Sequence, residues 1–192
     1  MISTLSNKIA LKLTEHNMIL QEDYKIYVYG FFMLISKAFF WTILLISGIL
    51  LKAFIEAVVF GLLFSGIRQY AGGYHASTET RCQLLSTLAI FFSILLIKIS
   101  KEYDLSLFLI ILTFISTVII FFLCPLDTPE KPLSENEIKY FRKKSRVILM
   151  VIFVVAMFSF VTKVNTLLAP CSVSLLLETI LIVCGKIKKS TI

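Results

Sequence analysis

Long apolar runs are the feature that most constrains how this chain can fold. They follow one another along the 192 residues, at 26–51, 53–67, 83–97, 105–123, 147–161 and 167–184. About 20 apolar residues are enough for a helix to cross a bilayer, whereas a membrane β-barrel needs alternating apolar and polar residues in each strand. Because the runs are continuous, the sequence predicts an all-α integral membrane protein with about six transmembrane helices.

The composition agrees with a membrane protein. Hydrophobic residues make up 58% of the chain and charged residues only 16%, against about a quarter in soluble domains. We expect a single membrane-embedded domain over residues 1–192. We expect no cleavable signal peptide, because the first residues lack a basic start, an apolar core and a small-residue cleavage site. Residues 1–25 are expected to form an amphipathic segment, with a helix at 3–22 that lies on the membrane surface or against the protein.

The distribution of Lys and Arg predicts the orientation. With the N-terminus inside, 14 of the 19 Lys and Arg fall in inner segments, four in outer turns and Lys37 within a span. The positive-inside rule therefore places both termini in the cytoplasm. The net charge of +7 is then mainly a signal of orientation and lipid contact, with a smaller part for attraction of an acidic substrate. A nucleic-acid partner is not expected, since no basic and aromatic platform lies outside the membrane runs.

The polar loop at 124–146 combines prolines with a helix start. Three prolines keep its first part extended. Ser134 and Glu137 then match the S-x-x-E pattern of a capping box. The sequence predicts a helix that begins here and continues into the apolar run at 147–161.

The spacing of the four cysteines does not indicate a disulfide framework. Cys124, Cys171 and Cys184 lie at the edges of apolar runs or within them, and are interpreted as packing residues. Neither C-x-x-C nor H-E-x-x-H occurs. The sequence therefore predicts no disulfide scaffold, no metal site and no cofactor.

Polar and glycine-rich residues interrupt the apolar pattern at 68–82, where the sequence reads RQYAGGYHASTETRC. The preceding run, 53–67, is short for a full span. Either the membrane is thinned there, or the chain continues beyond it as buried backbone that does not face lipid. Gly72 and Gly73 are expected to break the helix, because glycine adopts backbone conformations that other residues avoid. We interpret 68–82 as a catalytic loop that faces the cytoplasm.

A cysteine and a histidine in this loop are candidates for a catalytic pair. Ser77 or Thr78 is a suitable N-cap, so the next helix would begin near residue 79 with Cys82 in or near its first turn. The positive end of a helix dipole and a neighbouring His both favour a thiolate. On a continuous helix His75 and Cys82 would lie about 10.5 Å apart along the axis, too far for a hydrogen bond. The pair thus requires the chain to bend between them.

Other polar residues are candidates for supporting roles. Arg68 either marks the inner membrane edge, or pairs with a carboxylate of the substrate and stabilises the site. Glu79 and Asp127 could each orient His75, and the sequence does not choose between them.

The string R-x-x-x-G-G-Y-H-A, with a Cys seven residues after the His, resembles the accessory gene regulator B family. Members of this family are bacterial membrane cysteine endopeptidases that process a quorum-sensing propeptide. The resemblance covers the whole chain, including a Pro- and Lys-rich loop after the fourth run. It implies that His75 is the base and Cys82 the nucleophile. It also implies that Arg68 and Gly73 are needed, and Lys131 loosely matches a lysine of the family.

The same resemblance implies a reaction and partners. Cys82 would cleave the C-terminal tail from an autoinducer propeptide through a thioester acyl-enzyme. A Cys of the propeptide would then close a thiolactone (or lactone) ring. The family further implies a homodimer. With the charge count, this predicts a site at the cytoplasmic face of the bacterial cell membrane.

A second interpretation is a small membrane transporter or peptide export component, in which the motif lines a path. Lys37 and Glu56 are its best support, because charged residues within spans often mark substrate paths. Substitution of Cys82 and His75 separates the two functions, since only the peptidase requires both residues for cleavage.

Overall fold

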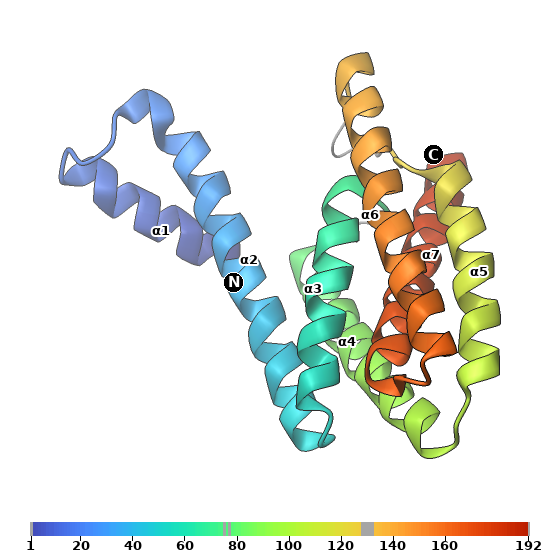
Figure 1. Ribbon diagram of the computed structural model, residues 1–192. Helices are drawn as coiled ribbons and strands as arrows, with labels where there is room; N and C mark the ends of the chain where they lie inside the picture. Colours follow the sequence, from blue (N-terminus) through green and yellow to red (C-terminus); the bar gives the residue numbers. More distant parts are fainter. Residues whose placement is uncertain (1, 75, 77, 128–132, 192) are drawn as a thin grey trace. The chain divides into compact units, whose positions relative to one another are not determined.

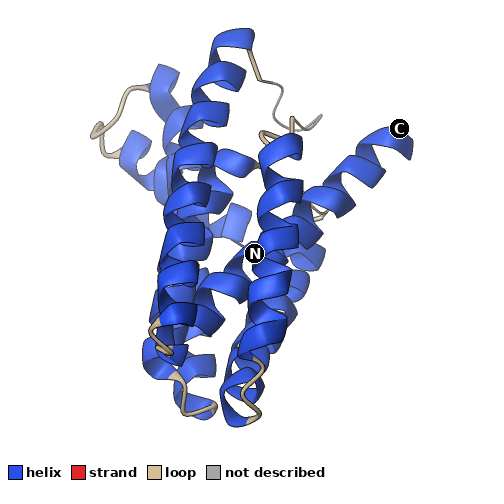
Figure 2. Cartoon of the chain, turned by 45° about the vertical axis from the view of Figure 1, so that its right-hand side comes forward, coloured by secondary structure: helices blue, strands red, loops and turns tan. Residues whose placement is uncertain are grey.

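The chain is helical throughout the part that the structure describes. The computed structural model describes residues 2–74, 76, 78–127 and 133–191. Within these ranges one isolated β-bridge occurs and no β-strand (Figure 2). The helices are α1 (Ile2–Glu15), the 3-10 helix η1 (Gln21–Asp23), α2 (Tyr24–Leu50), α3 (Phe54–Ala71), α4 (Glu79–Glu102), α5 (Ser106–Leu123), α6 (Glu135–Val161) and α7 (Asn165–Thr191).

Two compact units divide the chain. The first consists of Met1–Ile43 and Ala76–Leu88, and contains α1, the first part of α2 and the start of α4. The second consists of Leu44–His75 and Ala89–Ile192, and contains α3, α5, α6 and α7 with the remaining parts of α2 and α4. The expectation of a single domain stays a prediction.

The second unit is built around α7. This helix packs against α3, α5 and α6, and α6 also packs against α3 and α5 (Figure 1). Leu168, Leu175 and Ile182 are buried at seven-residue intervals, a spacing that keeps them on one side of the helix. Thr113 of α5 donates a hydrogen bond of 2.7 Å to Ser172 of α7, a contact typical of neighbouring transmembrane helices.

Six helices among the described residues are long and apolar enough to cross a membrane. The stretches are Gln21–Leu50, Phe54–Ala71, Glu79–Glu102, Ser106–Leu123, Glu135–Val161 and Thr166–Lys188. Large apolar side chains also cover their outward faces, and Phe122 and Val161 are each 75% exposed. Exposure of so much apolar surface to water is unfavourable, whereas lipid chains solvate it. The chain is therefore a multi-pass membrane protein, as predicted.

The capping box at the start of α6 is confirmed. The backbone N–H of Glu137 donates to the Ser134 hydroxyl at 3.4 Å, and the Glu137 carboxylate accepts from the Ser134 N–H at 2.9 Å. These bonds satisfy N–H groups that have no partner inside the helix. As predicted, α6 runs without a break from the polar loop into the apolar run.

The N-terminal helix is shorter than predicted. It ends at Glu15, so the expected helix at 3–22 is wrong beyond that residue. Asn17 adopts a φ of 55°, and the N–H of Met18 donates to the carbonyl of Leu13 at 2.9 Å. This is the pattern of a helix C-cap in which one residue takes the left-handed conformation, which Asn tolerates better than most residues. The location of α1 at a membrane surface stays a prediction.

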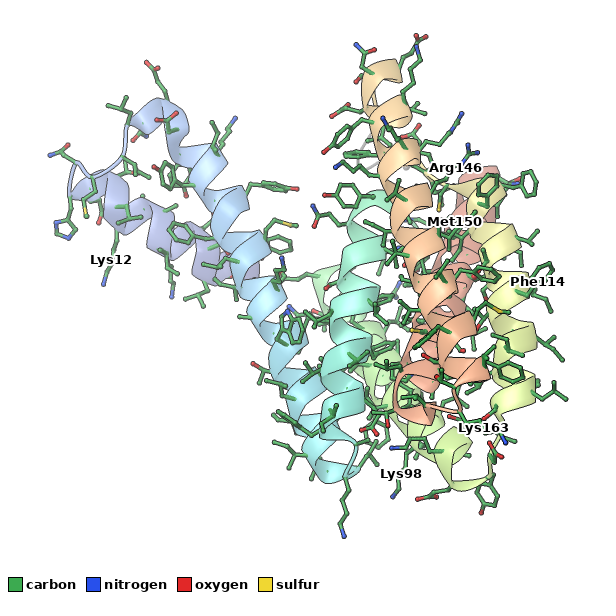
Figure 3. The ribbon with its side chains drawn as sticks, viewed as in Figure 1. Lys12, Lys98, Phe114, Arg146, Met150 and Lys163 are labelled. Atoms are coloured by element: carbon green, nitrogen blue, oxygen red, sulfur yellow. The ribbon has the colours of Figure 1, made fainter. Side chains whose placement is uncertain are left out.

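The basic residues of the second unit separate toward opposite ends of its bundle. Figure 3 shows Arg146 toward one end and Lys98 and Lys163 at the other. With the N-terminus inside, the order of the apolar runs places Arg146 on the inner side and the two lysines in outer turns. The separation agrees with that assignment, and the cytoplasmic location of the termini stays a prediction.

Candidate active site

The predicted break after α3 is confirmed at the glycine pair. The helix ends at Ala71, and Gly72 and Gly73 take φ values of 77° and 127°. Residues that carry a side chain rarely adopt either backbone conformation. A Cβ on Gly72 would also lie 2.5 Å from the carbonyl oxygen of Leu126, and a Cβ on Gly73 would collide with the guanidinium of Arg68. Glycine is therefore required at both positions by conformation and by space.

The segment after the break is held by backbone contacts on two sides. On one side Leu126, which follows α5, donates its N–H to the carbonyl of Ala71 at 2.9 Å and forms a parallel bridge with Gly72. On the other side Tyr74 donates its N–H to the carbonyl of Leu181 in α7 at 2.8 Å. Backbone groups of residues 71–74 are thus hydrogen-bonded within the protein, which agrees with the alternative of buried backbone beyond the short second run. The choice between the two alternatives stays a prediction.

A glycine of α7 makes this close approach possible. A Cβ on Gly185 would lie 2.9 Å from the backbone nitrogen of Tyr74 and 3.0 Å from the carbonyl carbon of Gly73. We call residues 71–74, with Leu126, Leu181 and Gly185, the glycine clasp. The clasp brings together three parts of the chain that are far apart in the sequence.

Arg68 supports the clasp from the last turns of α3. Its Nη1 donates to the carbonyl of Gly72, and its Nη2 donates to the carbonyl of Tyr74 at 2.8 Å. Nη1 also lies 3.6 Å from the carboxylate of Glu178 in α7. A carboxylate within the chain therefore pairs with Arg68, a contact that the sequence did not predict. A further contact with a substrate carboxylate stays a prediction.

Cys82 lies where the sequence predicted, in the first turn of α4. The helix begins at Glu79, and the Cys82 N–H donates to the carbonyl of Thr78 at 3.0 Å. The hydroxyl of Thr78 accepts a hydrogen bond of 3.4 Å from the N–H of Arg81, as an N-cap does. The cysteine is free and exposed, close to the positive end of the helix dipole. This is a suitable setting for a nucleophilic thiolate.

Three residues of the predicted site lie outside the described residues. They are His75, Ser77 as an alternative cap, and Lys131. The pairing of His75 with Cys82 and the role of Lys131 therefore stay predictions. The required departure from helical geometry between His75 and Cys82 is confirmed at the described residues Ala76 and Thr78, which lie outside any helix.

Glu79 binds the start of α1. Its carboxylate accepts from the N–H of Ile2, from the N–H of Ser3 at 3.3 Å and from the Ser3 hydroxyl at 2.6 Å. Gln83, one turn further along α4, also donates to it at 3.1 Å. Unpaired N–H groups and a partial positive charge at a helix N-terminus favour a carboxylate there. The turn that carries Cys82 is thus tied to α1, a contact that the sequence did not reveal.

Asp127, the other candidate to orient His75, accepts a hydrogen bond of 3.3 Å from the N–H of Leu133. It therefore helps to close the Pro- and Lys-rich loop at its base. For Asp127 and for Glu79, the proposed contact with His75 stays a prediction.

The other cysteines differ from Cys82. Cys124 and Cys171 are buried, as predicted for packing residues, while Cys184 is exposed. Burial, with the negative charge of Glu178 nearby, raises the pKa of the Cys124 thiol to about 12. A thiol that stays protonated near neutral pH is a poor nucleophile, so Cys124 is not a second candidate.

The charged residues that supported a transporter have different surroundings. Glu56 forms an ion pair with Lys101, so its charge is already balanced within the second unit. Lys37 is exposed on α2. Transport stays an untested alternative, with less support from Glu56 than the sequence indicated.

A model of a known protein family matches this chain. The model of accessory gene regulator B matches residues 6–182, nearly the whole chain. The chain belongs to the accessory gene regulator B (AgrB) family. Its place in this family gives it a role in the agr quorum-sensing system.

Two AgrB-like proteins of Clostridium perfringens are similar to this AgrB family member. The one from strain 13 is 29% identical over 86% of this chain and 80% of its own length. The one from strain SM101 is 28% identical over 80% of this chain and 74% of its own length. No solved structure matches the chain.

In this AgrB family member the structure brings together some of the predicted site residues and adds others. Arg68, Gly72 and Gly73 meet in the glycine clasp of the second unit, while Glu79 and Cys82 share a turn of the first. Sequence reasoning missed Glu178. It is the one acidic residue in the apolar run 167–184, and an acidic residue at that depth is a signal that could have identified it.

Proposed function

We propose that this AgrB family member is a membrane cysteine endopeptidase. It would remove the C-terminal tail of an autoinducer propeptide and promote cyclisation of the remainder. One observation carries the proposal: the motif of residues 68–82 places an exposed cysteine in the first turn of a helix, seven residues after a histidine and beyond a break in helical geometry. Such a cysteine is suited to nucleophilic catalysis with a histidine as its base.

Cleavage follows from the chemistry of a Cys–His pair. His75 takes the proton of the Cys82 thiol, and the thiolate attacks the carbonyl carbon of the bond ahead of the tail. When the tetrahedral intermediate collapses, the C–N bond breaks and His75 returns the proton to the leaving amine. The products are the free tail and a thioester between the propeptide and Cys82.

Cyclisation can follow from this thioester without a further energy source. The thiolate of a propeptide Cys attacks the thioester carbonyl, a thiolactone forms, and the Cys82 thiolate leaves. One thioester replaces another, so the exchange is close to balanced in energy if water does not intercept it. A site at the membrane edge helps to exclude water.

The surroundings of this reaction are part of the proposal. The charge distribution favours a site at the cytoplasmic face of the membrane, where a propeptide bound to the inner leaflet would meet it in two dimensions. Lys131 is the candidate contact for the acidic tail, by charge complementarity. The family resemblance favours a homodimer.

Substitution of the proposed pair tests the function directly. The protein is purified into liposomes with a candidate propeptide that has an amphipathic start, a central Cys and an acidic C-terminal tail, and release of the tail is followed by mass spectrometry. Cys82→Ala and His75→Ala are each expected to abolish cleavage while inserting into the membrane as the wild type does. Cys184→Ala, which removes the other exposed cysteine, is the matched control and is expected to cleave normally. Continued cleavage by either of the first two variants would falsify the proposal.

A further inference from the structure

We infer that Glu178 of α7 is a positioning residue for the segment that leads into His75. The inference rests on the proposed peptidase function, because its consequence is the placement of the base. Glu178 does not act on the substrate in this scheme. It acts through Arg68, which holds the backbone on both sides of Gly73.

Burial makes Glu178 unusual. Its side chain is 0% exposed, and neither carboxylate oxygen accepts a hydrogen bond from the described residues. A buried carboxylate without compensation is costly, and a spanning helix retains one only with a partner or a function. Its partner is Arg68, whose Nη1 lies 3.6 Å away. The residues within three positions of it on α7 are leucine, threonine and isoleucine, so none of them supplies a compensating charge.

Arg68 needs a counter-charge in order to hold the clasp. Its two terminal nitrogens donate to two neutral carbonyls, those of Gly72 and Tyr74, while the side chain is only 22% exposed. Two carbonyls alone do not balance a guanidinium that is largely removed from water. The carboxylate of Glu178 supplies that balance and determines where the planar guanidinium lies.

Helix α7 therefore positions the segment in two ways. The carbonyl of Leu181 binds the N–H of Tyr74 at 2.8 Å, and Glu178, three residues earlier on the same helix face, holds Arg68. Both constraints converge on Tyr74, the residue directly before His75. Loss of Glu178 would remove the constraint that acts through Arg68. His75, the proposed base, could then shift. A shift of about 1 Å at a reacting group can reduce the rate roughly 100-fold.

Two measurements on Glu178→Gln test the inference. The substitution keeps the shape and removes the charge. In liposomes we expect kcat for propeptide cleavage to fall about 100-fold with little change in KM, because the base is misplaced and substrate binding is not. Without any substrate, the rate of Cys82 alkylation by iodoacetamide at neutral pH should fall to that of His75→Ala. Glu178→Asp, which keeps the charge on a shorter side chain, should recover part of both rates.

Glu56→Gln is the matched control. It also removes a buried acid that is paired with a basic residue in the second unit, but its partner is Lys101 in the last turn of α4, which is not a residue of the glycine clasp. Both rates should equal those of the wild type. If only the loss of a buried ion pair mattered, Glu56→Gln and Glu178→Gln would lower both rates to the same extent.

The outcomes separate this inference from the proposed function. If His75→Ala slows both reactions but Glu178→Gln does not, the inference is wrong and the peptidase stands. If His75→Ala changes neither rate, the peptidase is wrong and the inference falls with it. If Glu178→Gln and Glu178→Asp both fail to reach the membrane while Glu56→Gln inserts, the role of Glu178 is in folding and the positioning role is overturned.

Discussion

The two halves of the motif at 68–82 are held in opposite ways. The first half, through Tyr74, is held within the second unit by the Arg68 guanidinium and two backbone hydrogen bonds, and its two glycines leave no space for a side chain. The second half, which carries Cys82, is an exposed helix turn that one carboxylate ties to α1. The difference indicates that precise placement is built into the half that leads to the proposed base. The half with the proposed nucleophile is left accessible, as the proposed peptide substrate would require.

The largest effect is expected from Gly73→Ala. The new Cβ would collide with the Arg68 guanidinium, and a φ of 127° is strained for any other residue, at a cost of roughly 1–3 kcal/mol. Cleavage should fall about 100-fold or more as the clasp opens. Gly66→Ala is the control on α3, since a Cβ there meets nothing within 4 Å. If the two variants cleaved equally fast in liposomes, the placement of residues 68–74 would not depend on the glycine clasp.

A smaller effect is expected from Gly185→Ala, which opens the clasp from the α7 side. Its Cβ would come within 3.0 Å of the backbone of Gly73 and Tyr74, so the segment must move outward by a few tenths of an ångström. Overpacking of this kind costs about 1–3 kcal/mol. We expect a lower thermal midpoint in detergent and a cleavage rate between those of the wild type and Gly73→Ala. An unchanged midpoint with full activity would show that α7 does not confine the segment.

The exposed half can be tested at the contact of Glu79 with the start of α1. Glu79→Gln removes the negative charge at the start of α1, and loss of a helix cap costs about 0.5–2 kcal/mol. Amide exchange in detergent should become faster at the first turn of α1 and remain unchanged at the backbone of the clasp. Glu22→Gln, on an exposed acid of η1, serves as the control. Unchanged exchange in α1 would mean that Glu79 does not hold the two helices together.

The smallest effect is expected at Cys124. Because burial raises the pKa of its thiol to about 12, Cys124 should remain protonated and unlabelled by maleimide at pH 9, where Cys82 reacts. Labelling of Cys124 should appear only after unfolding. Cys124→Ala should cleave the propeptide at nearly the wild-type rate. Peptide mass spectrometry after labelling provides the measurement, and rapid modification of Cys124 in the folded protein would remove the contrast with Cys82.

Local signals predicted the features that local chemistry controls. The S-x-x-E pattern identified the start of α6, the glycine pair identified the end of α3, and the cap before Glu79 placed Cys82 in a first turn. The end of α1 was missed because the left-handed conformation of Asn17 is one of several that an asparagine can take. Its presence in the sequence alone therefore did not require a helix end.

Contacts between distant segments were not predictable in the same way. Nothing near Arg68 in the sequence points to Glu178, more than a hundred residues later, or to Leu126 as the partner of Gly72. In the sequence, Gly185 is a single glycine after an apolar run, and nothing indicates that it lies against the backbone of Tyr74. An isolated acid in an apolar run indicates that a partner exists, but the partner is chosen by helix packing.

The sequence by itself determined the class of protein, the helices and the site motif, because continuous apolar runs, glycines and caps act through neighbouring residues and through the solvent they prefer. Only the tertiary structure decided which residues support that motif. A buried charge and an unpaired backbone group must be satisfied by whatever the fold brings within reach, and here the packing of α7 against α3 brings Glu178 and Leu181 to the motif.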